Sequence, residues 1–327
     1  MQKLHYFLLG LAISITACET VVEVDLPQEA PKLVTHAIIQ ADSTFWILLT
    51  QSKPILSQAD IQTVSGAEVT LYEEETRVAR LEENEENPGT GIYQSSFIPT
   101  AGQMYTLRIS KQGFESVEAT TYIQPAVPIQ HLRYDTTQYE YSYYDDSGSL
   151  VTGKEINLKE VWLTLNDSPD EDNFYEIQLL QYTTYYQGEE DENGEYIITD
   201  TLQRLDPIYL RSNDPVVADN EFFEEDGSFS GSSLVFTDEI FAGKSYTINF
   251  EAEGFYSSGN DGDDNKYIVV LRTLNDHFYR YRESVELQRD TEGNPFAEPV
   301  PVFNNIEEGY GIFAGFSNDT ETILIEE

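Results

Sequence analysis

The sequence predicts a mainly β protein, in which a β-sandwich over residues 31–125 precedes a second β-rich, sandwich-like domain over residues 126–327. Three observations lead to this prediction. Short segments such as residues 162–166 (WLTLN) alternate apolar and polar residues, and a period of two places one face of a strand in a core and the other in water. Turn-forming residues separate these segments at the spacing of sandwich strands. One segment, residues 275–288, has instead the period of a helix.

The chain begins with the pattern of a secretory signal peptide. Lys3 supplies a positive charge, and residues 7–15 (FLLGLAISI) form a mostly apolar run that is too short for the roughly 20 residues of a membrane-spanning helix. Small residues then precede Cys18, which is the only cysteine of the chain. We therefore expect residues 1–17 to be a cleaved signal peptide and residues 18–30 to be a tether.

The segment 15–18 (ITAC) resembles a lipobox, the motif at which bacterial lipoproteins are cleaved and acylated. The resemblance implies that Cys18 carries lipid such as palmitate, so that the protein is anchored to a membrane without spanning it. Glu19 stands where an Asp would retain a lipoprotein at the inner membrane, which favours the outer membrane. The sequence leaves open whether the protein faces the periplasm or the cell surface. The alternative role of Cys18 is a free cysteine buried in a core.

The composition predicts a folded and strongly acidic protein. The 59 acidic residues against 18 Lys and Arg give a net charge of −41, whereas nucleic-acid binding requires a basic surface. We therefore exclude nucleic acid as a partner. A single cysteine leaves no disulfide within the chain, so both domains must be held by burial of their cores. Solubility explains the acidic surface, and bound divalent cations are the alternative explanation.

In the first domain, the predicted strands are residues 32–40, 44–51, 67–72, 77–81, 91–97, 104–109 and 115–123. Two segments resemble parts of transthyretin-like and carboxypeptidase-regulatory-like sandwiches. Residues 65–71 are similar to a small-residue turn followed by a strand. Residues 99–109 are similar to a late hairpin, in which a glycine makes the turn and the Tyr after it packs near the end of the sandwich. The resemblance implies an Ig-like sandwich.

We interpret residues 125–128 as a hinge to the second domain, where longer acidic loops join the strands. The predicted strands are residues 129–144, 154–166, 174–186, 196–210, 234–236, 244–252 and 267–271. The predicted loops are residues 145–148, 167–173, 188–194, 213–231 and 254–265. Loops of this kind on a β scaffold are where a binding site is expected.

The predicted helix over residues 275–288 has one apolar face. That face is formed by Leu274, Phe278, Tyr281 and Val285. We expect the helix to close an open end, or to cover an edge strand, of the second sandwich. An extended, proline-stiffened segment over residues 294–306 follows it. In the strand predicted over residues 309–316, glycines alternate with aromatic residues, which indicates that neighbouring groups pack over the glycines.

Tyrosines are the candidate binding residues of the second domain. The candidates are Tyr139, Tyr141, Tyr143, Tyr185 and Tyr186. The first three alternate along one strand and therefore share a face. Tyrosine combines a large contact area with a polar tip and is enriched at recognition surfaces, which favours a platform for sugars or a protein. A core face with ordinary edge tyrosines is the alternative.

The sequence calls for no cofactor. The metal candidates are calcium ligands in one acidic loop, Asp261, Asp263 and Asp264, although the EF-hand spacing is absent and a solvated turn is the alternative. After cleavage, His36, His131 and His277 stand on separate predicted elements, and zinc would need three or four nitrogen or sulfur ligands. No nucleophile elbow, phosphate-binding loop or dinucleotide motif occurs. We expect no enzymatic activity; a hydrolase that uses two of the many carboxylates is the alternative.

The two ends of the chain together resemble one family. The lipobox is followed by residues 24–27 (VDLP) and 32–34 (KLV), and the tail carries residues 293–296 (GNPF), 298–300 (EPV) and 305–313 (NIEEGYGIF). This pattern is similar to a family of Bacteroidetes-type outer-membrane lipoproteins that is defined only by a domain of unknown function. The resemblance implies a β-rich lipoprotein associated with TonB-dependent receptor systems, and it supplies no catalytic or ligand residues.

We therefore expect a non-enzymatic lipoprotein of the outer membrane that acts as an accessory binding or assembly partner of a TonB-dependent transport system. A surface lipoprotein that itself binds glycans or peptides is the first alternative. An uncharacterised hydrolase is the second.

Overall fold

The structure of the chain is a computed structural model that describes residues 30–54, 57, 59–84, 86–144, 147–169, 171–190, 196–218, 229–253, 266–291, 297–298 and 300–325. The strands of its first half are β1 (Leu33–Gln40), β2 (Phe45–Gln51), β3 (Glu68–Glu73), β4 (Thr76–Glu83), β5 (Ile92–Ser95), β6 (Met104–Ser110), β7 (Val117–Tyr122), β8 (Ile129–Tyr144) and β9 (Leu150–Asn166). The second half contains β10 (Phe174–Glu190), β11 (Tyr196–Pro207), β12 (Tyr209–Ser212), β13 (Phe229–Gly231), β14 (Leu234–Thr237), β15 (Ser245–Glu253), β16 (Lys266–Leu274) and β17 (Tyr310–Leu324). The described helices are α2 (Pro215–Ala218) and α3 (Asp276–Thr291).

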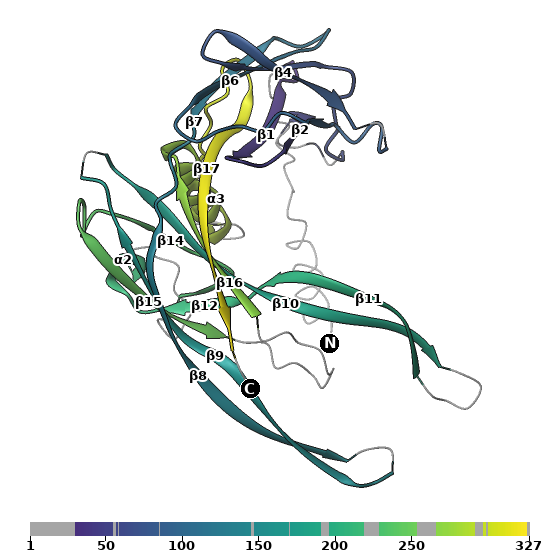
Figure 1. Cartoon of the computed structure of the whole chain (residues 1–327). Coiled ribbons are helices and arrows are strands. Elements are labelled where there is room, and N and C mark those ends of the chain that lie inside the picture. The colour runs from purple at the N-terminus through teal and green to yellow at the C-terminus, as the bar shows by residue number, and fades with distance from the viewer. Residues whose placement is uncertain are drawn as a thin grey trace, which may run out of the picture.

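The predicted mainly β fold is confirmed, and the described strands form two sheets (Figure 1). The larger sheet has twelve strands in the order β11-β10-β16-β17-β1-β2-β5-β4-β3-β6-β7, with β14 paired to β10. The smaller sheet has five strands in the order β13-β12-β15-β9-β8. All the strands expected in the first domain are present as β1 to β7, because alternation along a short strand is a local signal.

Strands β1 to β7 enclose the first core. The alternation of β1 is regular, with Leu33, Ala37 and Ile39 buried and their neighbours half-buried. The turn before β6 has the glycine and the buried tyrosine that the resemblance implied, but it is not part of a hairpin, because β5 pairs with β2 and β4 and β6 pairs with β3 and β7. Gly102 makes the turn with a φ of 78°, and the buried Tyr105 accepts a hydrogen bond from the backbone N–H of Thr100 at 2.9 Å. A buried aromatic ring with a bonded hydroxyl group therefore closes this end of the sandwich.

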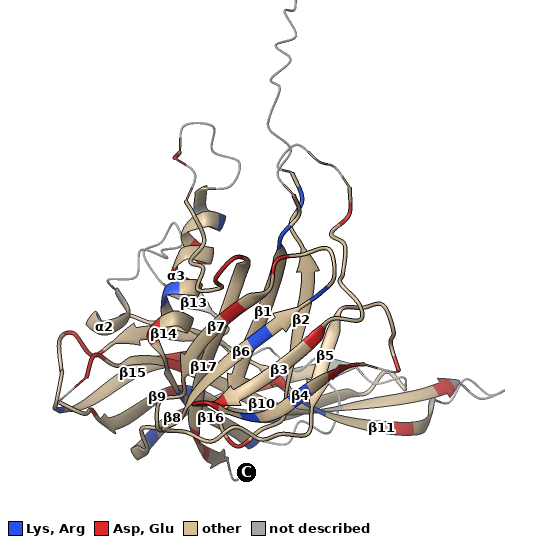
Figure 2. Cartoon of the chain, turned by 90° about the horizontal axis from the view of Figure 1, so that it is seen from above, with Lys and Arg blue, Asp and Glu red and all other residues tan. Residues whose placement is uncertain are grey.

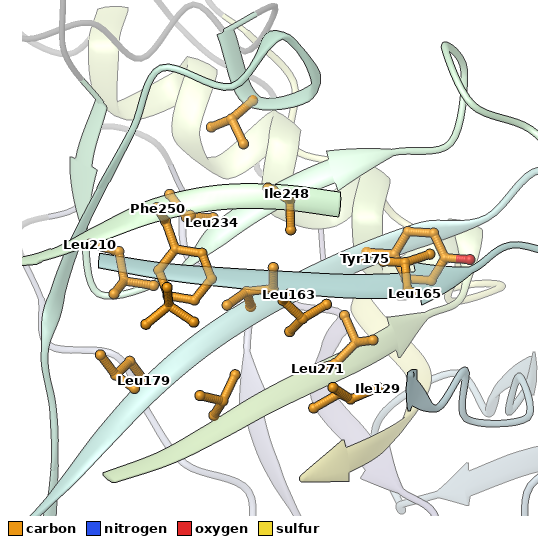
Figure 3. Packing of buried hydrophobic residues seen from close by; sticks show 14 of the residues in the cluster. Ile129, Leu163, Leu165, Tyr175, Leu179, Leu210, Leu234, Ile248, Phe250 and Leu271 are labelled. Atoms are coloured by element: carbon orange, nitrogen blue, oxygen red, sulfur yellow. The ribbon is translucent and has the colours of Figure 1, made fainter. Parts of the chain in front are cut away.

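The second core lies between the five-stranded sheet and the part of the larger sheet that contains β10 and β16. Figure 3 shows Leu163 of β9 and Phe250 of β15 facing Leu179 of β10 and Leu271 of β16. All four side chains are fully buried. Two sheets that each present one apolar face thus make a sandwich, as expected for the second domain.

Strand β17 contributes residues to both cores. It pairs in parallel with β1 through residues 310–316 and antiparallel with β16 through residues 316–324. Phe316 is the crossing point, since it pairs with Gln40 on one side and with Leu274 on the other. Figure 1 shows this strand, in yellow, running from one sandwich to the other. Phe313 of β17 belongs to the first core, although the sequence suggested that this segment serves the second domain.

The glycines of β17 let neighbouring groups approach closely, as predicted. Gly311 has a φ of 112°, and a Cβ atom there would overlap the backbone carbonyl oxygen of Thr35 on β1. At Gly315, a Cβ atom would lie 2.8 Å from Cγ1 of Ile123, which follows β7. Side chains at these positions would therefore push β17 away from β1 and from the end of β7.

Helix α3 covers the crossing point of β17. The sequence had predicted instead that this helix closes an open end, or covers an edge strand, of the second sandwich. Its residues Phe278 and Tyr281 pack in a third apolar cluster with Phe316. Asn275 begins the helix: its Oδ1 accepts the backbone N–H of Phe278 at 3.0 Å, and its Nδ2 donates to Oγ1 of Thr121 at 2.6 Å. One buried cap residue thus fixes the helix against β7 as well as β17. The apolar face was predicted correctly, but the neighbour it covers depends on pairing between distant strands.

The segment after β7, which we had interpreted as a hinge, is bonded to the second sandwich. The hydroxyl group of Ser317 donates to the carbonyl oxygen of Gln124 at 2.6 Å. The backbone N–H of Val127 donates to Thr273 at 3.0 Å, and that of Ile129 donates to Asp319 at 2.8 Å. Because β16 and β17 provide all three partners, this connection is a fixed contact and not a free linker.

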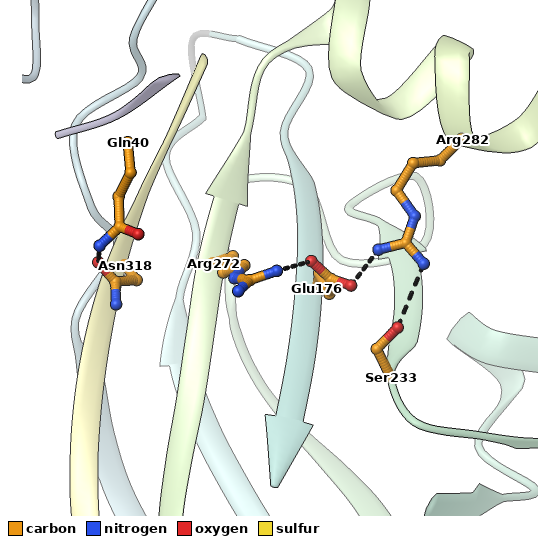
Figure 4. A network of polar contacts seen from close by, with 6 residues as sticks. All are labelled: Gln40, Glu176, Ser233, Arg272, Arg282 and Asn318. Atoms are coloured by element: carbon orange, nitrogen blue, oxygen red, sulfur yellow. Dashed lines mark hydrogen bonds and ion pairs between the residues drawn. The ribbon is translucent and has the colours of Figure 1, made fainter. Parts of the chain in front are cut away.

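A buried carboxylate joins β10, β16 and α3 (Figure 4). Glu176 is fully buried and forms ion pairs with Arg282 and, at 2.9 Å, with Arg272. Arg282 also donates to the hydroxyl group of Ser233 at 3.2 Å. Burial by itself raises the pKa of Glu176, but the charges of Arg282 and Arg272 outweigh it and hold the pKa below the ordinary value of 4.5. The carboxylate is therefore ionised and structural.

The close approach at Gly311 predicts a large loss of stability for Gly311→Ala. Gly113→Ala is the matched control, because Gly113 also has a positive φ, of 94°, but nothing lies within 4 Å of an added Cβ atom. The control should lose about 1–2 kcal/mol, the cost of a left-handed backbone. Gly311→Ala should lose at least about 3 kcal/mol, because β1 and β17 must also separate. Equal urea-unfolding midpoints for the two variants would contradict this account of β17.

The ion pairs of Glu176 predict a pH-dependent effect of Glu176→Gln. At neutral pH the variant should lose about 3 kcal/mol, because the two arginines keep their charges without a counter-ion. The folded-state pKa lies below 4.5, so the ionised form stabilises the fold above that pH, and this contribution disappears as the pH falls through the folded-state pKa. Urea unfolding at several pH values should therefore show a smaller acid-induced loss for the variant. The control Glu118→Gln removes an ion pair to Arg108 whose side chains are both 45% exposed, and it should cost less than about 1 kcal/mol. Equal losses in the two variants would refute the structural role of Glu176.

Candidate functional site

Two long β-hairpins extend beyond the second core, and they carry the tyrosines that the sequence singled out. We call them the β8–β9 arm (residues 136–158) and the β10–β11 arm (residues 181–207). Figure 1 shows the two arms leaving the body of the molecule and diverging. Beyond Leu158 in the first arm, and beyond Leu180 in the second, none of the described side chains is buried. Apart from Leu158 and Ile156 at the base of the first arm, which pack in the second core, the described residues of the arms do not contribute to either core.

The β8–β9 arm contains Tyr139, Tyr141 and Tyr143. Tyr139 is 41% exposed and pairs with Glu155. Tyr141 and Tyr143 lie in β8 as predicted, but their side chains are outside the described part of the chain, so their shared face remains a prediction. At the tip of the arm, an exposed Tyr144 pairs with an exposed Leu150.

The β10–β11 arm contains Tyr185 and Tyr186. Tyr185 pairs with Leu202 and is 37% exposed, whereas Tyr186 pairs with Thr201 and is half-buried. Successive residues of a strand point to opposite faces, so these two tyrosines do not form one surface. The structure therefore places the predicted tyrosines on two arms that belong to different sheets, and not on a single platform.

The rows of side chains that face the second core continue along both arms. In β10 the row begins with the buried Tyr175 and Leu179 and reaches the exposed Tyr185. In β9 the row runs from the exposed Leu150 at the tip to the buried Leu158 and, after a register shift opposite Asp135 and Thr136, to the buried Leu163. The exposed apolar residues of the β10–β11 arm are Tyr185, Ile197, Ile198, Leu202 and Leu205. The core-facing rows thus extend past the point where the opposite sheet covers them, and the exposed pairs Tyr185–Leu202 and Tyr144–Leu150 lie in them among polar residues.

A cation covers the ring of Tyr185. The guanidinium group of Arg204 lies 4.5 Å from the ring centroid, and its Nη2 donates to the tyrosine hydroxyl at 2.9 Å. The hydroxyl group in turn donates to Asp206 at 2.8 Å. Lys266 covers Tyr182 in the same way, 4.2 Å from its centroid. These rings are therefore partly occupied by neighbours of their own chain, which disfavours a stacked sugar at Tyr185.

The lipidation site and the calcium candidates lie outside the described residues. Cys18 precedes the first described residue, and Asp261, Asp263 and Asp264 fall between β15 and β16 in the undescribed range 254–265. These assignments remain predictions. Within the described part of the chain, no three His, Cys, Asp or Glu side chains come together in a group that could hold a metal ion.

Two buried carboxylates lie at one end of the second core. Asp167 accepts hydrogen bonds from the hydroxyl group of Tyr175 at 2.6 Å and from the backbone N–H of Gly243 at 2.7 Å. Asp238 is only 4% exposed, and its Oδ2 has no hydrogen-bond partner among the described residues. Burial raises the pKa of Asp238, and the nearby charge of Asp167 adds to this effect. The bonds of Asp167 connect core elements, so this carboxylate has a structural role.

A second surface that the sequence analysis missed is a cleft on the first sandwich, with a volume of about 650 Å³. Trp46 lies in it and is 54% exposed. Trp46 pairs with Gln94 on β5, and Gln94 pairs with Glu82 on β4, so three strands contribute to one outer row. The signal was present in the sequence, because the alternation of β2 buries Phe45 and Ile47 and turns Trp46 outward.

A family model described as Domain of unknown function (DUF4249) matches residues 19–322, which is nearly the whole chain. No curated protein matches the chain. In the described part of the chain, none of the helices has both the length and the apolar character needed to cross a membrane.

The burial of Asp238 predicts that Asp238→Asn is more stable than the wild type at neutral pH. The folded-state pKa of Asp238 lies above the ordinary value of 3.8, so protonated Asp238 stabilises the fold fully below pH 3.8. This stabilisation is lost as the pH rises through the folded-state pKa. An asparagine cannot ionise and should avoid that loss. The control Asp167→Asn disturbs two hydrogen bonds and should lose about 1–3 kcal/mol. Urea unfolding at acidic and neutral pH tests both variants, and a comparable loss in Asp238→Asn would contradict the assignment.

Proposed function

The chain belongs to the family of this domain of unknown function, and we propose that it is an outer-membrane lipoprotein that acts as a non-enzymatic accessory or assembly partner of a TonB-dependent transporter. In this proposal Cys18 carries the lipid, and the two arms bind the transporter. The observation that carries the proposal is the continuation of core-facing rows onto arms that no other part of the described chain covers.

The exposed pairs on the arms are costly in water unless a partner covers them. Tyr144 and Leu150 form one such pair, and they are 73% and 57% exposed. Tyr185 and Leu202 form the other, at 37% and 49%. Directly opposed residues of antiparallel strands share a face, so each pair presents apolar surface on one face, part of which Arg204 covers at Tyr185. Exposed apolar surface on a projecting element is the usual mark of a protein interface.

Both arms also end in an edge strand. Among the described strands, β11 is the last strand of the larger sheet and β8 is the last strand of the smaller one. Edge strands present unpaired backbone groups, and proteins use them to bind partners by adding a strand to the sheet. The arms therefore offer a transporter both backbone hydrogen-bonding groups and apolar side chains.

The class of partner follows from the resemblance of the chain ends to lipoproteins of TonB-dependent systems. Glu176 and Asp167 are bonded to structural partners, so the proposal gives neither of these buried carboxylates a catalytic role. Apart from Asp238, the other acidic residues whose side chains are described are exposed or half-buried, and Figure 2 shows acidic positions on the β10–β11 arm. A surface of this charge favours a partner whose contact region is apolar with a basic rim.

The proposal predicts that the affinity-tagged, full-length protein co-purifies with a TonB-dependent transporter from detergent-solubilised membranes. The double variant Leu150→Ser/Leu202→Ser should recover the transporter at least about tenfold less well, because it removes one residue of each exposed pair. The matched control is Ile61→Ser/Ile98→Ser, which changes two side chains of similar size that are 65% and 50% exposed outside the arms. All variants should keep the wild-type thermal midpoint. A wild-type protein that purifies without a transporter would refute the proposal, as would equal recovery by the arm variant.

The anchoring part of the proposal has a separate test. Cys18→Ala should move the protein from the membrane fraction to the soluble fraction and should abolish incorporation of labelled palmitate. Membrane association and labelling that persist in this variant would contradict lipidation at Cys18.

A further inference from the structure

The cleft on the first sandwich contains a tryptophan ring that nothing else in the described chain covers. Trp46 is 54% exposed, and no cation, ring or hydrogen-bonding group of the described residues lies on it. The other tryptophan differs, because the guanidinium group of Arg133 lies 4.0 Å from the ring centroid of Trp162. Exposed Tyr185 is likewise covered by Arg204. Trp46 thus offers an open apolar face beside polar groups.

The groups around Trp46 are polar, and most of their charge is already engaged. No Lys or Arg is among the residues that line the cleft. Of its carboxylates, Glu82 pairs with Arg80 at 3.1 Å. Glu83 accepts the backbone N–H groups of Gly66 at 2.9 Å and of Gly89 at 3.0 Å. Burial raises the pKa of Glu83, but these hydrogen bonds and one from Ser65 outweigh it and lower the pKa, so Glu83 is an ionised, fixed part of the wall.

The bonds of Glu83 also make the wall of the cleft rigid. They connect the end of β4 to the turn at Gly66 and to the loop at Gly89. The side chain of Asn84 accepts the backbone N–H of Glu86 at 2.9 Å, which connects two further residues of the cleft. A site that is formed before its ligand arrives avoids the entropic cost of ordering its loops on binding.

We propose that this cleft is a binding site for a neutral oligosaccharide. A sugar ring has one face of C–H groups, which can stack on the open indole of Trp46, and a rim of hydroxyl groups, which can exchange hydrogen bonds with Gln94, Asn84 and the carboxylates. The volume of about 650 Å³ lies within the roughly 300–1,000 Å³ of small-molecule sites. An anionic sugar would be repelled by Glu83 and Glu86, because no Lys or Arg lines the cleft. This site goes beyond the proposed function, because it lies on the first sandwich and does not involve the arms.

The chain provides a direct fluorescence reporter for this site. It contains two tryptophans, so Trp162→Phe leaves Trp46 as the sole tryptophan of the full-length protein. In this background, cellohexaose, maltohexaose, xylohexaose and mannohexaose are titrated as neutral probes. Oligogalacturonate is the anionic probe, and hexalysine is the cationic probe. Isothermal titration with the wild type and with Trp46→Ala and Gln94→Ala gives the affinities. The control variant is Ile61→Ser, at an exposed apolar residue that does not line the cleft.

We expect at least one neutral hexasaccharide to change the emission of Trp46 in a saturable way, with no such change for oligogalacturonate. Trp46→Ala should weaken its binding at least about tenfold, and Gln94→Ala should weaken it less, while Ile61→Ser leaves it unchanged. Trp46 is exposed, so its removal should leave the thermal midpoint unaltered. The proposal is overturned if no neutral probe binds, if binding persists in Trp46→Ala, or if hexalysine alone binds. Because the readout does not involve a transporter, either proposal can fail without the other.

Discussion

The fold depends on one strand that comes last in the chain. β17 pairs with β1 through residues 310–316 and with β16 through residues 316–324, so a single strand connects the two sandwiches. Its parallel pairing with β1 joins segments from opposite ends of the chain, which carries a cost in loop-closure entropy. Full burial of Phe313 and Ile312 in the middle of the strand offsets that cost. The close approach that this packing requires explains why glycines interrupt the strand.

Polar contacts at the junction make the two sandwiches interdependent. Asn275 caps α3 and at the same time binds Thr121 near the end of β7, while Ser317 and Asp319 of β17 bind the connection between β7 and β8. Buried groups of this kind are satisfied only when the sandwiches are docked, because separation would leave donors and acceptors without partners. The arms and the cleft of Trp46 are therefore parts of one assembly, even though they lie on different sandwiches.

The sequence predicted the features that depend on neighbouring residues. Alternation located β1 to β7 and the start and end of β8, and helical spacing located α3. It did not predict the pairing of β1 with β17, because registers between distant strands leave no periodic signal. The loop expected over residues 188–194 was partly wrong, since β10 continues to Glu190 and forms part of an arm. The sequence located the tyrosines in strands, but it did not predict that they lie on two sheets. Trp46 was overlooked, although the alternation of β2 turns it outward.

The arms carry both exposed apolar residues and features that disfavour aggregation through edge strands. Ion pairs occur on both arms, between Lys154 and Glu140 at 3.1 Å and between Arg204 and Asp206 at 2.9 Å. A register shift at Gln187 also interrupts the ladder between β10 and β11. Charges and bulges of this kind protect exposed edges, and a net charge of −41 adds repulsion between copies of the chain. The exposed apolar pairs of the arms, Tyr144 with Leu150 and Tyr185 with Leu202, thus stand among charged and polar residues. Charges beside exposed apolar pairs disfavour pairing between two copies of this acidic chain, which is the discrimination that the proposed function requires of the arms.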